Sequence, residues 1–374
     1  MQRPFLLGQA SERGVTGLKV LLLSRYGRLG ASSRVRSYQY LPYLRDAGLD
    51  VTPAPLLGDH YIERLYDGGH QNAARIVAAY CRRLWQLATC ARFDLLWIES
   101  ELLPWMPAWL EGLLARLGVP YVVDYDDAVF HRYDLHSHGW VRGVLGGKID
   151  RVMRQARLVI VGSDYLGDRA RRAGAIRVEY LPTVVDVTRY RVPSNGVGSG
   201  YNIGWIGSPL TASSLSVVQR ALVELCANGN GRVTLVGAGQ FTLDSVPIDL
   251  RPWSEATEVA ELQRFDVGIM PLPDGPWERG KCGYKVIQYM ACGRPVVASP
   301  VGANLRIVEH GRDGLLATTP ADWIAALRTL QDASLRRRMG AAGRAKVERE
   351  YCVQVTAPRL AALLRSAAQP DTAR

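Results

Sequence analysis

Residues 280–314 contain the side-chain types and spacing that suit binding of an anionic ligand. Gly283 precedes an amphipathic segment, residues 284–292, whose apolar positions recur at helical spacing. Lys281 and Lys285 flank the start of this predicted helix. A helix start presents backbone N–H groups without intrahelical partners, and two ammonium groups beside it favour an anion such as a diphosphate. The alternative interpretation is a solvated helix face that binds nothing.

The scarcity of lysine in this chain makes these two positions informative. Lys and Arg together number 46, of which only five are lysines, and two of the five are Lys281 and Lys285. An ammonium group is a compact point charge, whereas a guanidinium is a planar fork. Lysine at these two positions of an arginine-biased chain therefore favours a site that needs a compact charge.

The same segment carries a family resemblance. It begins GKCGYKVIQYMACGRPVVAS, and Val301-Gly302 and a GRDGLL stretch at 311–316 follow. The pattern resembles the EGFGLxxLEAMACGxPVVAS signature of the family-four retaining glycosyltransferases of GT-B fold. The Glu-x7-Glu pair of that signature is missing, because Gly280 and Gln288 stand at the two glutamate positions.

The resemblance implies roles for these positions. In the family the second glutamate binds the ribose hydroxyls of the nucleotide, and the Gln288 amide keeps a donor and an acceptor for that task. We therefore expect Gln288→Glu to be tolerated. The first glutamate contacts the transferred sugar, and Gly280 has no side chain to replace it. The 204–211 loop lacks the Arg and Lys of the family, so Lys281 and Lys285 are expected to supply positive charge.

From the resemblance we expect a retaining, metal-independent glycosyltransferase with a UDP- or GDP-linked sugar as donor substrate, no further cofactor, and a glycan or lipid-linked acceptor. The predicted catalytic residues are Lys281 and Lys285, and the predicted donor-binding residues are Gly207, Ser208, Gly283, Tyr284 and Gln288. On the acceptor side the predicted residues are Arg34, Asp126, Asp127 and His131. No metal ligand is predicted.

The expected chemistry follows from charge. When the sugar–phosphate bond breaks, negative charge grows on the β-phosphate of the leaving nucleotide. The N–H groups of Gly283 and Tyr284, together with a lysine, would stabilise that charge more in the transition state than in the ground state. In the family the leaving phosphate itself accepts the proton of the acceptor hydroxyl, so a missing carboxylate pair is no objection to catalysis.

The elements that must position these residues alternate between strand and helix in both halves of the chain. Predicted strands lie at 19–24, 49–52, 95–99, 120–124 and 158–162, then at 202–206, 232–236, 266–270 and 296–299. Such alternation predicts parallel sheets wrapped by helices, with ligands beyond the carboxyl ends of the strands. We expect an α/β fold of two Rossmann-like, doubly wound domains that face each other across a cleft, the GT-B arrangement.

The predicted domain limits follow from composition and from the resemblance. Residues 1–192 form an acceptor-side domain, and residues 193–350 form a domain that binds the nucleotide sugar. The glycine- and serine-rich stretch at 194–200 is the best linker candidate. A helical tail over 335–365 is expected. Residues 351–374 at the end of the chain are expected to cross back to the first domain.

Composition places the chain among ordinary globular proteins. It has 374 residues, of which 48% are hydrophobic and 22% charged. No apolar run approaches the ~18 residues that cross a bilayer, and the run at 5–7 is too short for a signal-peptide core. We expect a cytoplasmic protein. The six cysteines show no CxxC pair, which predicts reduced thiols.

Positive charge is concentrated in one region. The net charge is +11, and residues 132–177 hold 10 basic against 4 acidic side chains. A predicted amphipathic helix at 140–157 and an apolar run at 102–109 lie in or near this region. We therefore expect peripheral contact with an anionic membrane, on the inner face of the plasma membrane. The family resemblance implies a role in bacterial surface polysaccharide or glycolipid synthesis. A core-packed helix with a basic outer face is the alternative. No nucleic-acid motif is present.

Several alternatives remain open at the sequence level. Asp124-Tyr125-Asp126 contains a DxD, which binds a metal in GT-A glycosyltransferases, although capping or acceptor contact is the favoured role here. The Gly237-Ala238-Gly239 stretch lacks the third glycine of a dinucleotide-binding fingerprint. Loss of both glutamates allows a catalytically inactive binding module of the same fold. A sugar-nucleotide epimerase of that fold is a third alternative.

Overall fold

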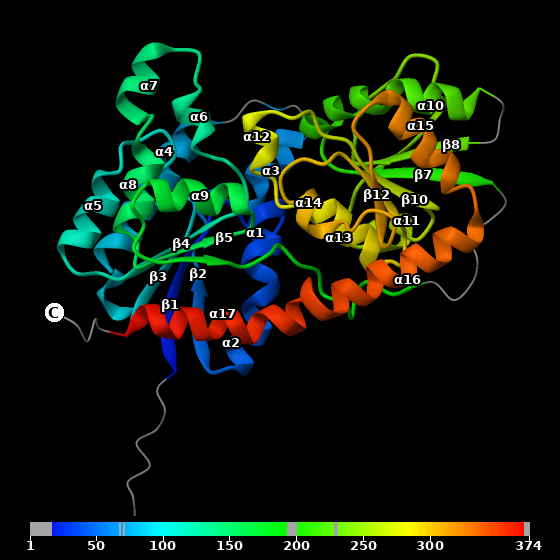
Figure 1. Ribbon diagram of the computed structural model, residues 1–374. Coiled ribbons are helices and arrows are strands. Elements are labelled where there is room, and N and C mark those ends of the chain that lie inside the picture. The colour runs from blue at the N-terminus through cyan, green and yellow to red at the C-terminus, as the bar shows by residue number, and fades with distance from the viewer. Residues whose placement is uncertain (1–16, 67–68, 70–71, 193–199, 228–230, 370–374) are drawn as a thin grey trace, which may run out of the picture.

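Two parallel sheets organise the molecule. The computed structural model describes residues 17–66, 69, 72–192, 200–227 and 231–369. Their strands form two six-stranded sheets, ordered β2-β1-β3-β4-β5-β6 and β12-β11-β10-β7-β8-β9, and every pairing is parallel. Helices flank each sheet, and the two α/β halves lie side by side (Figure 1). The predicted fold class, two Rossmann-like domains, is confirmed.

The first sheet consists of β1 (Leu18–Leu23), β2 (Leu49–Pro53), β3 (Leu95–Glu99), β4 (Tyr121–Tyr125), β5 (Leu158–Val161) and β6 (Val178–Tyr180). Its helices are α1 (Ala31–Arg36), α2 (Leu41–Asp46), α3 (Asp59–Tyr66), α4 (Ala73–Ala88), α5 (Trp109–Arg116), α6 (His131–Asp134), α7 (Gly139–Leu145), α8 (Lys148–Gln155) and α9 (Asp164–Arg172). Strands β3, β4 and β5 are buried along their whole length, as central strands covered on both faces must be.

The second sheet consists of β7 (Tyr201–Ile206), β8 (Gly231–Val236), β9 (Ile248–Arg251), β10 (Val267–Met270), β11 (Val296–Ala298) and β12 (Gly314–Leu316). Its helices are the 3-10 helix η3 (Pro209–Val218), α10 (Gln219–Cys226), α11 (Glu258–Leu262), α12 (Pro276–Arg279), α13 (Tyr284–Ala291), α14 (Asn304–Ile307) and α15 (Pro320–Thr329). The signature segment thus forms α13 and β11, close to the predicted limits.

The structure differs from the prediction in one helix and in three short strands. The helix expected over 140–157 is two helices, α7 and α8, because Gly146-Gly147 separates them. The apolar face of α8 lies in the core, so the predicted membrane-binding amphipathic helix is wrong for that half: Ile149, Val152 and Met153 are fully buried. The short strands β6, β9 and β12 were not predicted, because they are partly exposed and lack the wholly buried apolar run of the equally short β5, β10 and β11.

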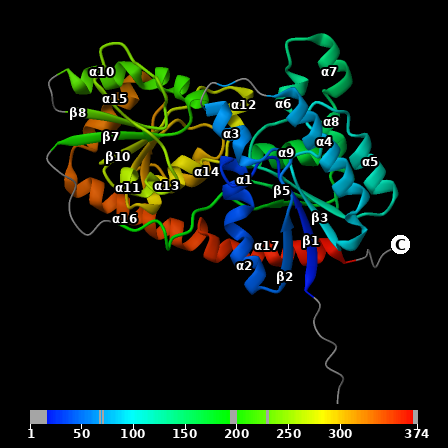
Figure 2. The same cartoon turned by 180° about the vertical axis from the view of Figure 1, so that it is seen from behind.

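The C-terminal helices join the two domains. Helix α16 (Ala333–Glu350) packs on α13 of the second domain, whereas α17 (Val353–Ala368) packs on α2 and on strands of the first sheet. Both views show α17 lying along the first domain (Figure 2). The two helices replace the single helix expected over 335–365. The boundary between residues 192 and 193 stays a prediction, since residues 193–199 of the linker lie outside the described residues.

The order of strands shows where a ligand would bind. In the first sheet β1 has β2 on one side and β3 on the other, and in the second sheet β7 lies between β8 and β10. In open parallel sheets ligands bind at such switch points, beyond the carboxyl ends of the strands. The loops that follow β1 and β7 are therefore the positions at which a site is expected. Within the described part of the chain, no helix is long and apolar enough to cross a membrane.

Candidate functional site

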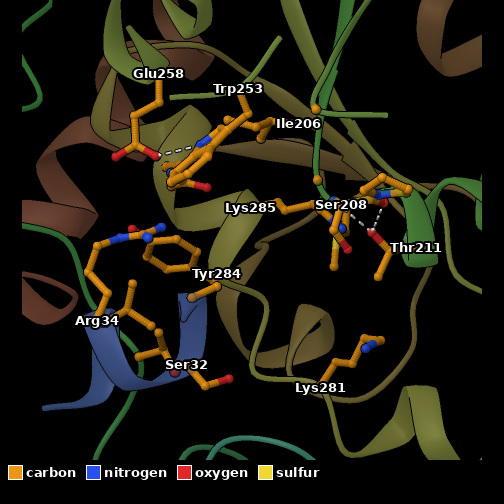
Figure 3. A pocket seen from close by; sticks show the side chains of 18 of the residues that line it. Ser32, Arg34, Ile206, Ser208, Thr211, Trp253, Glu258, Lys281, Tyr284 and Lys285 are labelled. Carbon is orange, nitrogen blue, oxygen red and sulfur yellow. Dashed lines mark hydrogen bonds between the residues drawn. The ribbon is translucent and has the colours of Figure 1, made fainter. Parts of the chain in front are cut away.

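A cavity of about 620 Å³ lies between the two domains at these switch points. The first domain contributes residues of the β1–α1 loop, α1 and the loop after β4, and the second contributes the loops after β7, β8 and β9 and the start of α13. This volume is within the ~300–1,000 Å³ usual for small-molecule sites. Figure 3 shows its charged and aromatic lining side chains.

The start of α13 opens on this cavity. Gly283 is the N-cap residue with φ of 67°, a left-handed conformation that favours glycine. A Cβ atom at this position would lie 2.3 Å from Ile307 Cδ1, so steric contact also requires glycine. The first N–H groups of a helix have no intrahelical partner. Gly283 and Tyr284 both line the cavity, as predicted for an anion-binding helix start.

Both predicted lysines reach the cavity. Lys285 Nζ lies 4.9 Å from the ring centre of Trp205, and burial lowers the pKa of this ammonium group to about 7, with a further lowering by Lys281. Lys281 Nζ lies 3.7 Å from Asp127 Oδ1 of the first domain. Asp127 partly offsets this lowering, and an added anion would favour the charged form of Lys285 further.

The loop after β7 is the third predicted part of the donor site. Gly207 and Ser208 line the cavity, and Ser208 precedes helix η3. The Ser208 N–H donates to Thr211 Oγ1 at 3.2 Å, and the Thr211 hydroxyl donates to the Ser208 carbonyl at 3.0 Å. These bonds fix the turn at the mouth of the cavity, and they occupy the Ser208 N–H (Figure 3).

Gln288 belongs to a buried hydrogen-bond chain that sequence reasoning missed. Its Nε2 donates to Tyr190 Oη at 2.8 Å, and the Tyr190 hydroxyl donates to Glu258 Oε1 at 2.9 Å. The Trp253 indole N–H donates to Glu258 Oε2 at 3.1 Å. Glu258 is 1% exposed, and Gln288, Trp253 and Glu258 line the cavity. This end of the cavity is therefore aromatic and already hydrogen-bonded.

Arg34 crosses from the first domain to this aromatic end. It lies on α1 and is 5% exposed, with its guanidinium carbon 4.7 Å from the ring centre of Trp253. Its Nη1 is buried and has no hydrogen-bond partner within the described residues. Figure 3 shows Arg34 reaching from α1 towards Trp253 and Tyr284. The guanidinium thus stacks on Trp253, and its Nη1 can donate to a hydrogen-bond-accepting ligand.

The predicted acceptor-side aspartates lie at the opposite end, near Lys281. Asp126 and Asp127 line the cavity, and burial raises the pKa of Asp127 to about 6. Asp124, the first residue of the DxD, is instead bound by Arg36, whose Nη2 donates to it at 2.6 Å. Asp124 does not line the cavity. Among the residues that the structure describes, no group of three or more His, Cys, Asp and Glu is arranged to hold a metal ion.

His131 does not line the cavity. Its Nδ1 lies 2.8 Å from Asp134 Oδ1, and its Nε2 lies 2.8 Å from Tyr165 Oη. Both ring nitrogens therefore have partners within the first domain. His131 therefore pairs with Asp134 and Tyr165 outside the lining of this cavity, and its acceptor-side role stays a prediction.

Gly280, at the first glutamate position of the family, is pressed against the first domain. A Cβ atom there would lie 2.5 Å from Ala128 Cβ and 2.9 Å from Ala128 N. The Ser163 hydroxyl donates to the Gly280 carbonyl at 3.3 Å, and the Cys282 thiol donates to the Asp126 carbonyl at 2.9 Å. The lysine-bearing loop and the aspartate-bearing loop are thus docked across the two domains, with no room for a side chain at position 280.

Comparison with protein families accounts for both halves of the chain. Residues 9–183 match the family model described as "Glycosyl transferase 4-like domain", and residues 201–332 match the model described as "Glycosyl transferases group 1". A GDP-mannose-dependent monoacylated alpha-(1-6)-phosphatidylinositol monomannoside mannosyltransferase of Corynebacterium glutamicum is 26% identical over 50% of this chain and 56% of its own length. The chain spans at most 62% of the length of the three curated relatives that it matches.

Solved structures share the fold over almost the whole chain. Sucrose-phosphate synthase from Thermosynechococcus elongatus superimposes with a TM-score of 0.69 at 16% identity, over 93% of this chain and 98% of that one. Anabaena HepE in complex with UDP superimposes with a TM-score of 0.68 at 16% identity, over 93% and 100%. At this identity the superpositions show the two-domain fold.

Proposed function

This chain belongs to the group 1, GT4-like glycosyltransferases of GT-B fold, and we propose that it transfers a sugar from a UDP- or GDP-linked donor to a glycan or lipid-linked acceptor. One observation carries the proposal. A single cavity joins a cationic end, built from Lys281, Lys285 and the start of α13, to an aromatic end built around Trp253 and Glu258. A nucleoside diphosphate has two complementary parts: an anionic diphosphate for the cationic end and an aromatic base for the aromatic end.

The aromatic end suits a nucleoside. The face of an aromatic ring can stack on a base, and the guanidinium of Arg34 lies over Trp253 at this end of the cavity. Gln288 and Glu258 supply amide and carboxylate groups that can bind ribose hydroxyls, so ribose recognition does not depend on a glutamate at position 288. The relatives support a nucleotide-linked donor, because HepE was solved with UDP and the Corynebacterium enzyme is GDP-mannose-dependent.

The cationic end suits the leaving diphosphate. As the sugar–phosphate bond breaks, charge grows on the β-phosphate, and preorganised donors aimed at that charge lower the barrier. The first N–H groups of α13 and the Lys285 ammonium are such donors. Lys285 has a pKa of about 7. It should therefore gain a proton as well as a counter-ion when the diphosphate binds. We assign Lys281 and Lys285 to this role.

One observation favours a second candidate, a nucleotide-binding module without turnover. Position 280 has no room for the family glutamate, since a Cβ there would overlap Ala128. A sugar-nucleotide epimerase of the same fold is the third alternative. The three candidates differ in the products that they form from the donor.

The deciding experiment incubates the protein with a panel of UDP- and GDP-sugars without acceptor. The products are followed by anion-exchange chromatography. A glycosyltransferase releases free nucleotide slowly from its own donor, and Lys285→Ala slows that release. Binding without release would support the inactive module, and a new sugar nucleotide would support the epimerase.

We further propose that the acceptor is presented at an anionic membrane on the cytoplasmic side. Large apolar side chains are exposed on the loop before α5, at the first residue of α5 and on α7: Trp105 by 48%, Trp109 by 51% and Trp140 by 69%. Trp105 and His136, which precedes α7, have ring centres 5.7 Å apart, so the two segments are adjacent. Helix α7 projects from the first domain (Figure 1). Exposed aromatic side chains beside a basic segment suit an anionic interface.

Flotation with anionic liposomes at low and high salt tests this part. Screening shortens the Debye length from ~10 Å at 0.1 M to ~3 Å at 1 M, so binding should weaken with salt without vanishing. Trp109→Ser combined with Trp140→Ser should reduce flotation. Ile176→Ser, which removes an 83% exposed apolar side chain before the edge strand β6, is the matched control. No flotation at low salt would favour a soluble acceptor.

A further inference from the structure

The carboxylates that line the cavity differ in how they are bound. At the aromatic end each carboxylate oxygen of Glu258 already accepts one hydrogen bond, from Tyr190 and from Trp253 respectively. Asp127, at the cationic end, has a buried Oδ1 without a hydrogen-bond partner within the described residues. Its nearest cation, Lys281 Nζ, is 3.7 Å away, which is beyond hydrogen-bond distance. The Ala128 N–H bonds the Asp127 carboxyl, but its Oδ1 is an unsatisfied acceptor on a residue that lines the proposed donor site.

The contact between residues 280–282 and residues 126–128 explains why this carboxylate comes from the first domain. The backbone at Gly280 lies against Ala128, and the Cys282 thiol donates to the carbonyl of Asp126. This contact excludes any side chain at position 280 and brings the aspartates beside Lys281. Of the residues that line the cavity, Asp126 and Asp127 supply the only carboxylates at this end.

We propose that the diphosphate of the donor and Asp127 are alternative partners of Lys281, and that Asp127, once displaced, accepts hydrogen bonds from hydroxyl groups of the transferred sugar. The inference rests on the proposed function and names the group that recognises the sugar. It is a binding role: no bond is made or broken at Asp127.

The charges make this exchange selective for a sugar nucleotide. A diphosphate is a stronger partner for an ammonium group than one poorly placed carboxylate is, because it carries more than one negative charge. A free nucleoside diphosphate then leaves the Asp127 carboxylate facing phosphate oxygens, with repulsion between like charges and no compensating donor. A sugar on the β-phosphate places hydroxyl donors between them. Asp127 should therefore favour the sugar nucleotide over the free nucleotide.

The exchange has a signature that a purely structural role lacks. Asp127→Asn removes the negative charge with almost no change in shape. Free UDP or GDP should then bind more tightly, because both the repulsion and the competition for Lys281 are lost. The sugar nucleotide should bind about tenfold or more weakly, as expected for loss of a hydrogen bond to a charged group. The two ligands thus respond in opposite directions.

The test is isothermal titration calorimetry of UDP, GDP and the panel of UDP- and GDP-sugars against wild type and Asp127→Asn. Asp164→Asn is the matched control, since Asp164 pairs with Arg306 at 3.0 Å across the same two domains and does not line the cavity. Asp127→Ser repeats the measurement if circular dichroism shows the asparagine variant to be unfolded.

Each result separates the inference from the proposed function. Opposite shifts for free nucleotide and sugar nucleotide in the Asp127 variants, with Asp164→Asn unchanged, support the exchange. Equal weakening of both ligands, or no change in either, overturns it while leaving the proposed function intact. A wild-type protein that binds no nucleotide at all overturns the proposed function and this inference with it.

Discussion

The two ends of the cavity are built in different ways. At the cationic end, Lys281, Gly283 and Lys285 lie within five consecutive residues, and the charges are poorly satisfied: Lys285 has a pKa lowered to about 7, and Lys281 lies 3.7 Å from Asp127. At the aromatic end, the side chains of Tyr190, Trp253, Glu258 and Gln288 come from distant segments and already bind one another.

The difference indicates which end changes when a ligand binds. A hydrogen-bonded network that is complete without ligand is preorganised and should keep its geometry. A cluster of incompletely paired charges gains most from an added anion, and its protonation should change with binding. Variants at the cationic end should therefore alter donor use with little effect on folding. Variants at the aromatic end should alter folding as well.

The largest expected effect is at the lysines. Lys285→Ala and Lys281→Ala should each weaken donor use, measured as kcat/KM, by about 1.5–3 kcal/mol, as for a hydrogen bond between charged groups. The free energy of unfolding should change by less than about 0.5 kcal/mol in Lys281→Ala. Lys19→Ala, an exposed lysine on β1, is the matched control. Wild-type turnover in the double variant would show that the diphosphate binds elsewhere.

The next largest effect is expected on stability at Gly280, whose contact with Ala128 excludes the glutamate of the family. Gly280→Ala should lower the free energy of unfolding by about 1–3 kcal/mol, the usual effect of overpacking, because the new Cβ would lie 2.5 Å from Ala128 Cβ. Gly58→Ala is the control, since a Cβ at position 58 meets no atom within 4 Å. Urea unfolding measures both. Equal stability of the two variants would mean that the interdomain contact is absent in solution.

At the aromatic end, the structure reverses the expectation that Gln288→Glu is tolerated. Tyr190 has one hydroxyl proton, which it donates to Glu258, and it accepts from the Gln288 amide. A glutamate at position 288 would remove the amide donor and would place two carboxylates around the single hydroxyl proton of Tyr190. Gln288→Glu should therefore destabilise the protein by about 1–3 kcal/mol.

The pH dependence gives a further check on Gln288→Glu. Burial and Glu258 should raise the pKa of the new carboxyl in the folded state above its unfolded value, so the folded state binds the extra proton. The stability of the variant relative to wild type should accordingly be restored at low pH and lost as pH rises through the folded pKa. Thermal unfolding over a pH series measures this, and a pH-independent difference would contradict it.

The smallest expected effect is on the number of protons that Lys285 binds. The unfolded chain binds a proton at Lys285 between pH 7 and 10.5 that the folded chain lacks, so this lysine makes stability rise with pH over that window. Lys285→Met should flatten the rise. Nucleotide binding at about pH 8 should take up close to one proton, which calorimetry in buffers of different ionisation enthalpy detects. Proton-neutral binding would mean that the lysine does not meet the diphosphate.

The same contrast explains what the sequence could predict. The start of α13 was predicted because one contiguous stretch carries the glycine, the lysines and the helical spacing. Tyr190, Trp253 and Glu258 were missed, because their association depends on tertiary packing and because β9, which positions Trp253, has only four residues. The inward position of the α8 apolar face could not be separated from a membrane-facing one, since both give the same periodicity. The pairing of His131 with Asp134 and Tyr165 was also not predicted.

The central claim is that one ligand occupies both ends of the cavity. Isothermal titration calorimetry of UDP and GDP against wild type, Lys285→Ala and Trp253→Ala tests it most directly. The account predicts that wild type binds one nucleotide per chain and that each variant, at opposite ends of the cavity, binds it at least about tenfold more weakly. A folded wild-type protein that binds neither nucleotide, or a nucleotide affinity unchanged in both variants, would contradict the claim.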